Sequence, residues 1–170
     1  MIMPRLRKIL APLLLSLLLL VTSCAKEPPS RFEQAQQESS QQRSGQAVDK
    51  NATQGAQFNK FFPKAGAGYD LVYTQEKKGF VEAKLKQGGK DMAMLAISDT
   101  ISTPTAAAKF QQSTKTIGGY PAVELGKTQT AVLVNNRYQV KALSRDPSFA
   151  ASDREAWLKK FDLRGLARLK

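Results

Sequence analysis

Histidine is absent from this chain of 170 residues, and Cys24 is its only cysteine. Without an imidazole there is no Ser-His-Asp or Cys-His pair and no histidine-ligated metal, and one cysteine forms neither a zinc ribbon nor an internal disulfide. We therefore predict no metal, no cofactor and no catalytic residue. Apolar residues make up 42% of the chain, with a single Trp, which suffices for one modest hydrophobic core.

Acidic residues are also scarce, with 14 Asp and Glu against 26 Lys and Arg. Three of the cations, Arg5, Arg7 and Lys8, precede an uncharged, leucine-rich stretch over residues 9–21. A membrane-spanning helix needs about 20 apolar residues, and this stretch is shorter and ends in small residues. The pattern predicts a cleaved export signal peptide over residues 1–23.

The end of this segment, Val21-Thr22-Ser23-Cys24, resembles the lipobox of bacterial lipoproteins, in which a lipidated cysteine becomes the mature N-terminus. The resemblance implies a diacylglycerol on the sulfur of Cys24, usually with an N-acyl chain such as palmitate. Two acyl chains hold a protein stably on a membrane, because each methylene buried in the bilayer contributes about 0.8 kcal/mol to the binding free energy. Ala25 stands where many lipoproteins of the inner membrane carry Asp. The resemblance thus implies an exported protein on the outer membrane, facing the periplasm, if the host is Gram-negative.

After the cysteine the composition becomes polar. Residues 25–57 hold eight Gln and four Ser but no Leu, Ile, Met, Trp or Tyr. Such a segment cannot form a core, so we predict that residues 24–57 are a disordered, lipidated tether with a typical span of about 30 Å. A helix over residues 32–42 is the alternative, although it would have no apolar stripe with which to dock.

Residues 58–170 form the predicted folded domain, with 19 basic and 10 acidic residues. Apolar and charged residues alternate over 81–86, the period of a strand with one wet face, and an apolar run follows at 92–97. Gly88-Gly89 between them predicts a hairpin. A second hairpin is predicted from the apolar run 130–134, the turn Asn135-Asn136 and the alternating residues 138–142.

Helices are expected after each hairpin. One begins near Thr103, with Pro104 in its first turn. Another opens with a capping box at residues 152–155 and places Ala156, Trp157 and Phe161 on its apolar side. Asp162 is expected to cap a short last helix through Leu163, Leu166 and Leu169.

The two hairpins resemble each other, because a shift of 47 positions superposes Gly88-Gly89 on Asn135-Asn136 and Asp99 on Asp146. The fold prediction is therefore an α+β domain in which two hairpins share one antiparallel sheet and helices pack on it. This order is similar to that of the PsbP-like accessory proteins.

Five basic residues are predicted on outward strand positions, free of packing roles. If the hairpins are neighbours, they make one basic surface for an anionic envelope component or an acidic protein partner. The alternative is that they only protect strand edges and keep the protein soluble. Nucleic acid is not expected as a partner, because export removes it. The five residues are Lys84, Lys86, Lys90, Arg137 and Lys141.

Two other patterns have weaker functional interpretations. A glycine loop at residues 118–121 can cradle phosphate only before a helix, and a strand pattern follows it, so a tight turn is favoured. Four carboxylates can act as an acid/base pair only if the fold brings two of them together. They are Glu82, Asp99, Glu124 and Asp146.

Two classes of function therefore stay open. The first is a lipid-anchored, non-enzymatic binding or accessory module of the cell envelope. The alternative is an envelope enzyme that uses carboxylates, or a carrier with an apolar pocket between sheet and helices.

Overall fold

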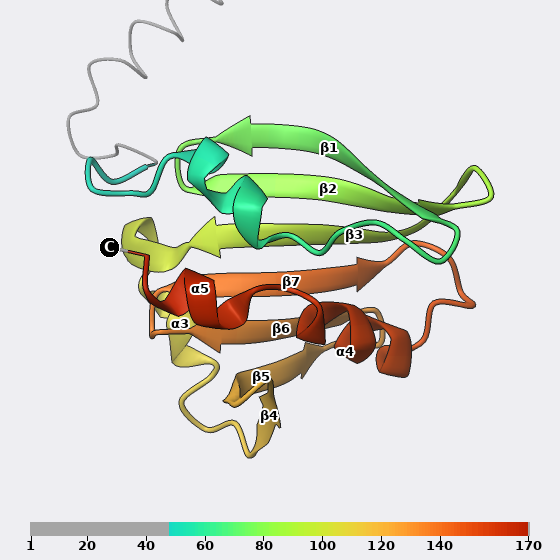
Figure 1. Ribbon diagram of the computed structural model, residues 1–170. Helices are drawn as coiled ribbons and strands as arrows, with labels where there is room; N and C mark the ends of the chain where they lie inside the picture. Colours follow the sequence, from blue (N-terminus) through green and yellow to red (C-terminus); the bar gives the residue numbers. More distant parts are fainter. Residues whose placement is uncertain (1–47, 170) are drawn as a thin grey trace, which may run out of the picture. The chain divides into compact units, whose positions relative to one another are not determined.

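The computed structural model describes residues 48–169 (Figure 1). The predicted signal peptide, Cys24 and the tether up to residue 47 lie outside the described residues. Within the described range, one seven-stranded antiparallel sheet carries short helices, which confirms the predicted α+β class. The strands are β1 (Tyr69–Lys77), β2 (Phe80–Gln87), β3 (Lys90–Asp99), β4 (Lys115–Ile117), β5 (Tyr120–Leu125), β6 (Gln129–Val134) and β7 (Tyr138–Ser144).

The hydrogen-bonded order of the strands is β1-β2-β3-β7-β6-β5-β4. Two meanders, β1 to β3 and β4 to β7, therefore meet where β3 pairs with β7. The register of this central pair runs from Ala93 opposite Ser144 to Asp99 opposite Tyr138.

Both predicted hairpins are present, as β2–β3 and β6–β7. Gly88 and Gly89 have φ values of 56° and 81°, and Asn135 and Asn136 have 52° and 51°. Two successive positive φ angles match the right-handed twist of the flanking strands, and Gly and Asn adopt them at low cost. Residues 118 and 119 form the tight turn of a third hairpin, β4–β5, as favoured from the sequence.

Helices cover the sheet unevenly. In Figure 1, η1, α4 and α5 lie across one face of the sheet, and their buried side chains join those of β2, β3, β6 and β7 in the main core. The segment around α3 packs on the opposite face, where Phe110 contacts Ala131 and Leu133. The helices are η1 (Gly55–Phe61), η2 (Thr100–Ser102), α3 (Thr105–Ala108), α4 (Ala151–Lys159) and α5 (Leu163–Ala167).

The sequence analysis places the start of the folded domain at Phe58, but the packed part of the chain begins earlier. Ala52 and Thr53 are buried, and η1 and the residue that follows it insert Phe58, Phe61 and Phe62 into the core. The prediction missed this because polar residues dominate the segment, and its few apolar side chains are spaced for a 3₁₀ turn too short to show a period.

The helix predictions are corrected in two places. The helix expected from Thr103 has only four residues, α3. The C-terminal helix α4 begins at Ala151, because Asp153 caps it by accepting a hydrogen bond from the Ala150 amide (2.8 Å). Its buried side is Arg154, Trp157 and Leu158, whereas Ala156 is exposed.

The short last helix agrees with the prediction. Asp162 Oδ1 accepts a hydrogen bond from the amide of Gly165 (2.8 Å), and Leu163 and Leu166 are buried. The cap and the two leucines hold α5 against the same face as α4.

Trp157 is buried in the main core, as expected, with its ring 5.1 Å from that of Tyr69. We predict that Trp157→Ala lowers the free energy of unfolding by about 3 to 5 kcal/mol, because it removes a large buried side chain and leaves a cavity. Chemical denaturation measures the change. Val72→Ala, at a side chain that is 46% exposed, is the control and should cost less than about 1 kcal/mol. Equal costs would contradict the placement of Trp157.

Candidate functional site

Arg154 is the most unusual residue of the main core, because its side chain is a charged group that is only 3% exposed. The guanidinium crosses from α4 to the sheet. Nε donates to Thr130 Oγ1 (2.8 Å), one terminal nitrogen to Ser144 Oγ (2.9 Å) and the other to Glu124 (3.0 Å). These bonds fix the planar group against β5, β6 and β7 and compensate its burial.

Glu124 links this arginine to the surface. Its other oxygen accepts from Lys115 (3.1 Å), which also pairs with Glu155 on α4. Burial opposes ionisation of Glu124, but hydrogen bonds from Thr130, Arg154 and Lys115 outweigh it and lower the pKa of the carboxyl. Glu124 is therefore a fixed anion that holds Arg154 in place.

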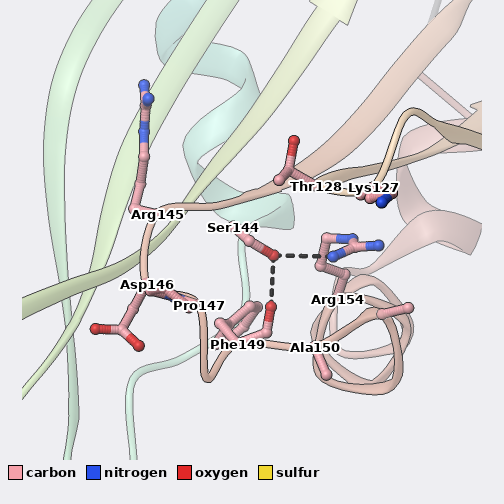
Figure 2. A pocket seen from close by; sticks show the side chains of 10 residues that line it. Lys127, Thr128, Ser144, Arg145, Asp146, Pro147, Phe149, Ala150 and Arg154 are labelled. Atoms are coloured by element: carbon pink, nitrogen blue, oxygen red, sulfur yellow. Dashed lines mark hydrogen bonds between the residues drawn. The ribbon is translucent and has the colours of Figure 1, made fainter.

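A pocket of about 290 Å³ opens beside Arg154 at the N-terminal end of α4 (Figure 2). Ser144 and Arg154 point toward each other within it, whereas Arg145 and Asp146 extend outward from the rim. Its remaining walls are Lys127, Thr128, Pro147, Phe149, Ala150 and Ala151.

The charge of this pocket favours anions. Lys127 and Arg145 line it as cations, together with Arg154, whose charge is shared with Glu124, and two hydroxyl side chains, and the first turn of α4 adds its partial positive charge. The one acidic residue of the lining, Asp146, stays ionised, because the amide and hydroxyl of Ser148 donate to its carboxylate and lower its pKa, so cations still outnumber anions in the lining. The arrangement can hold a carboxylate or a phosphate, but it presents no base or nucleophile beside a second reactive group.

The predicted basic residues do not form one surface. Lys84 and Lys86 both pair with Asp91, at 2.7 Å and 3.4 Å. Lys90 is exposed at the start of β3, and Lys141 lies on β7 with its ammonium 5.7 Å from the ring centre of Phe80. Asp91 thus compensates about one of these two positive charges.

Arg137 corrects the prediction most clearly, because it does not point outward from a strand. Its guanidinium donates to both oxygens of Asp99 (3.0 Å and 2.8 Å) and to the carbonyl oxygen of Asn51 (2.9 Å). The carboxyl of Asp99 also accepts from the amide of Thr53 (2.9 Å). This cluster ties residues 51–53 to the ends of β3 and β7, so the arginine has a structural role.

The four candidate carboxylates lie in separate hydrogen-bond networks. Asp99 is paired with Arg137, Glu124 with Arg154, Asp146 with Ser148, and Glu82 accepts from Thr74 (3.2 Å). Among residues 48–169, no three His, Cys, Asp or Glu side chains gather as a metal-binding group. No helix in this range has the length and apolarity needed to cross a membrane.

The sequence analysis missed the residues that line the Arg154 pocket. They come from the turn between β5 and β6, the end of β7 and the start of α4, which are distant in sequence and share no motif. Arg154 itself lies inside the expected capping box at residues 152–155, and the sequence analysis assigns it no role. Its burial could have been predicted from its spacing, because Arg154 lies three and four residues before Trp157 and Leu158 and so on the same face of the helix.

Comparison of the chain with protein families, curated proteins and solved structures finds no match. The likeness to bacterial lipoproteins and to PsbP-like accessory proteins therefore stays a prediction, and function has to be argued from the pocket and the charges.

The Asp99 cluster predicts a dependence of stability on pH. Burial opposes ionisation, yet hydrogen bonds from Arg137, Thr53 and Ile101 lower the pKa of Asp99 in the fold. Its contribution is therefore present above the unfolded pKa of about 3.9 and is lost as pH falls through the folded value. Asp99→Asn should destabilise the protein by about 2 kcal/mol near pH 7 and progressively less below pH 4. Thermal melts across this range test the prediction.

Asp70→Asn is the control for this experiment, because Asp70 is exposed on β1. It should leave the melts unchanged at every pH. An Asp99→Asn penalty as large at pH 2 as at pH 7 would show that the carboxylate charge is not what stabilises the cluster.

Proposed function

We propose that the chain is a lipid-anchored, non-enzymatic binding module of the cell envelope, exported and held on its membrane through Cys24. Its folded part receives an anionic group of a partner in the pocket beside Arg154. The observation that carries this proposal is the buried guanidinium of Arg154, which three hydrogen bonds hold at a pocket with two further cations. A preorganised cation of this kind binds without first losing side-chain freedom.

The size and lining of the pocket define the chemical class of its ligand. At about 290 Å³ it is at the small end for ligand sites, so it suits a carboxylate or phosphate group with a short apolar neighbour that contacts Phe149 and Pro147. The alternatives have less support. The carboxylates needed by an enzyme are separated, and the space between the sheet and helices α4 and α5 is filled by Trp157, Leu158 and Leu166, which leaves a carrier no room for a ligand on that face.

The anchor makes one prediction. Cys24→Ala should abolish incorporation of radioactive fatty acid and release the protein from the membrane or leave it unprocessed, because the sequence has no other cysteine. Metabolic labelling followed by fractionation measures both effects. Equal label in the wild type and in the variant would contradict lipidation at this residue.

The pocket makes a second, independent prediction. Inorganic phosphate or acetate added to the mature, unlipidated chain should shift the amide signals of Thr128, Ala150 and Ala151 in a saturable way. Lys127→Glu with Arg145→Glu should weaken this binding by more than about tenfold, since reversal turns attraction into repulsion. The two anions distinguish a phosphate site from a carboxylate site.

Lys77→Glu with Lys78→Glu is the matched control, because it makes the same change in net charge at the other end of the sheet. It should alter the pocket shifts by less than about twofold. If both double variants weaken binding equally, the anions respond to net charge alone, and the pocket is not a site.

A further inference from the structure

A second group of cations lies where the described chain begins. Lys77 and Lys141 place their ammonium groups 5.4 Å and 5.7 Å from the ring centre of Phe80. Lys78, in the turn after β1, donates to the carbonyl oxygen of Lys50 (2.6 Å) and so holds the N-terminal segment beside this cluster. We call Lys50, Lys77, Lys78 and Lys141, with Phe80, the basic end.

Within residues 48–169, the lysines of the basic end make no ion pair, in contrast to Lys84 and Lys86. The nearby acids bind other groups: Asp49 accepts from the Asn51 amide, Glu76 from Asn59 and Glu82 from Thr74, and Asp99 is paired with Arg137. Lys109 adds a further positive charge, and its pKa is lowered by burial and by the ammonium of Lys141. The ammonium groups of Lys77, Lys109 and Lys141 therefore lie near one another, and none of the three forms an ion pair within residues 48–169.

The basic end also has a hollow of about 320 Å³. Val48, the first described residue, forms part of its wall. Lys77, Lys78, Phe80 and Asp99, which is paired with Arg137, also line it. Figure 1 shows that the chain enters the fold at this end of the sheet. The segment that leads back to Cys24 is thus attached directly beside the crowded lysines.

We propose that the basic end lies against the membrane that holds Cys24 and binds the headgroups of its anionic lipids. This inference rests on the proposed lipid anchor for its location in the cell. About two dozen residues join Cys24 to Val48, and even fully extended they reach no farther than about 80 to 86 Å. This connection keeps the domain near the membrane and joins it to the anchor at the basic end.

The chemistry of the basic end matches that surface. Lysine side chains are attracted to an anionic membrane when they lie within a screening length of about 8 to 10 Å of its surface. Each lysine adds only a modest binding free energy, so several must act together. The ring of Phe80, flanked by two of these lysines, can lie at the headgroup level. Covalent anchoring raises the local concentration of headgroups, so weak contacts suffice to orient the domain.

The experiment uses the mature chain carrying Cys24→Ala, so that no lipid contributes to binding. Sedimentation with vesicles containing about one third phosphatidylglycerol, and with pure phosphatidylcholine vesicles, is measured at low and high salt. We expect binding to the anionic vesicles only, weakened by salt. Lys77→Glu, Lys78→Glu and Lys141→Glu together should reduce it by on the order of 100-fold, and the three corresponding Gln changes by about tenfold or more.

Lys84→Glu, Lys86→Glu and Lys90→Glu together form the matched control, because they make the same change in net charge toward the other end of β2 and β3 and lie in neither the basic end nor the Arg154 pocket. The affinity of this variant for the anionic vesicles should fall by less than about fivefold. Melting temperatures verify that each variant folds. An equal loss in both triple Glu variants, or no salt-sensitive binding of the parent chain to anionic vesicles, overturns the inference. Because the chain is unlipidated, either result leaves the fatty-acid test of the anchor unaffected.

Discussion

The antiparallel pairing of β3 with β7 is the constraint on which the other features of the fold depend. It joins residues 93–99 to residues 138–144, and so converts two local meanders into one sheet with a continuous core. Most side chains of both strands are buried. Each end of this pair also places a charged cluster: Asp99 and Arg137 at one end, Ser144 and Arg154 at the other.

Two arginine clusters, around the buried Arg154 and around Arg137 with the buried carboxylate of Asp99, hold the remaining chain onto this pair. Arg137 connects the segment around Thr53 to the start of β7, and Arg154 connects α4 to three strands. Removing a charge from water is costly and is offset only by complete, well-aligned hydrogen bonds. Such bonds form in one arrangement of the elements, so the arginines select that arrangement rather than simply adding stability.

The central hairpins could be predicted because their period of two, and the paired residues of their turns, are local in sequence. β1 could not, because it is an edge strand with mostly exposed side chains and a bulge between Tyr73 and Gln75, which removes the alternation. The ion-pair partners of the basic residues could not be predicted from the sequence either. Outward alternation placed Lys84 correctly on a strand, but its pairing with Asp91 depends on a register that includes a bulge after Leu85.

The same strand pair relates the two proposed functions. β7 has seven residues, so its ends are separated by about 20 Å. The basic end lies near Tyr138 and Phe80, and the pocket lies near Ser144. A domain whose basic end rests on lipid headgroups would therefore present the Arg154 pocket on the side away from the membrane. This separation exceeds the screening length, so the negative lipid surface would not repel an anionic partner from the pocket.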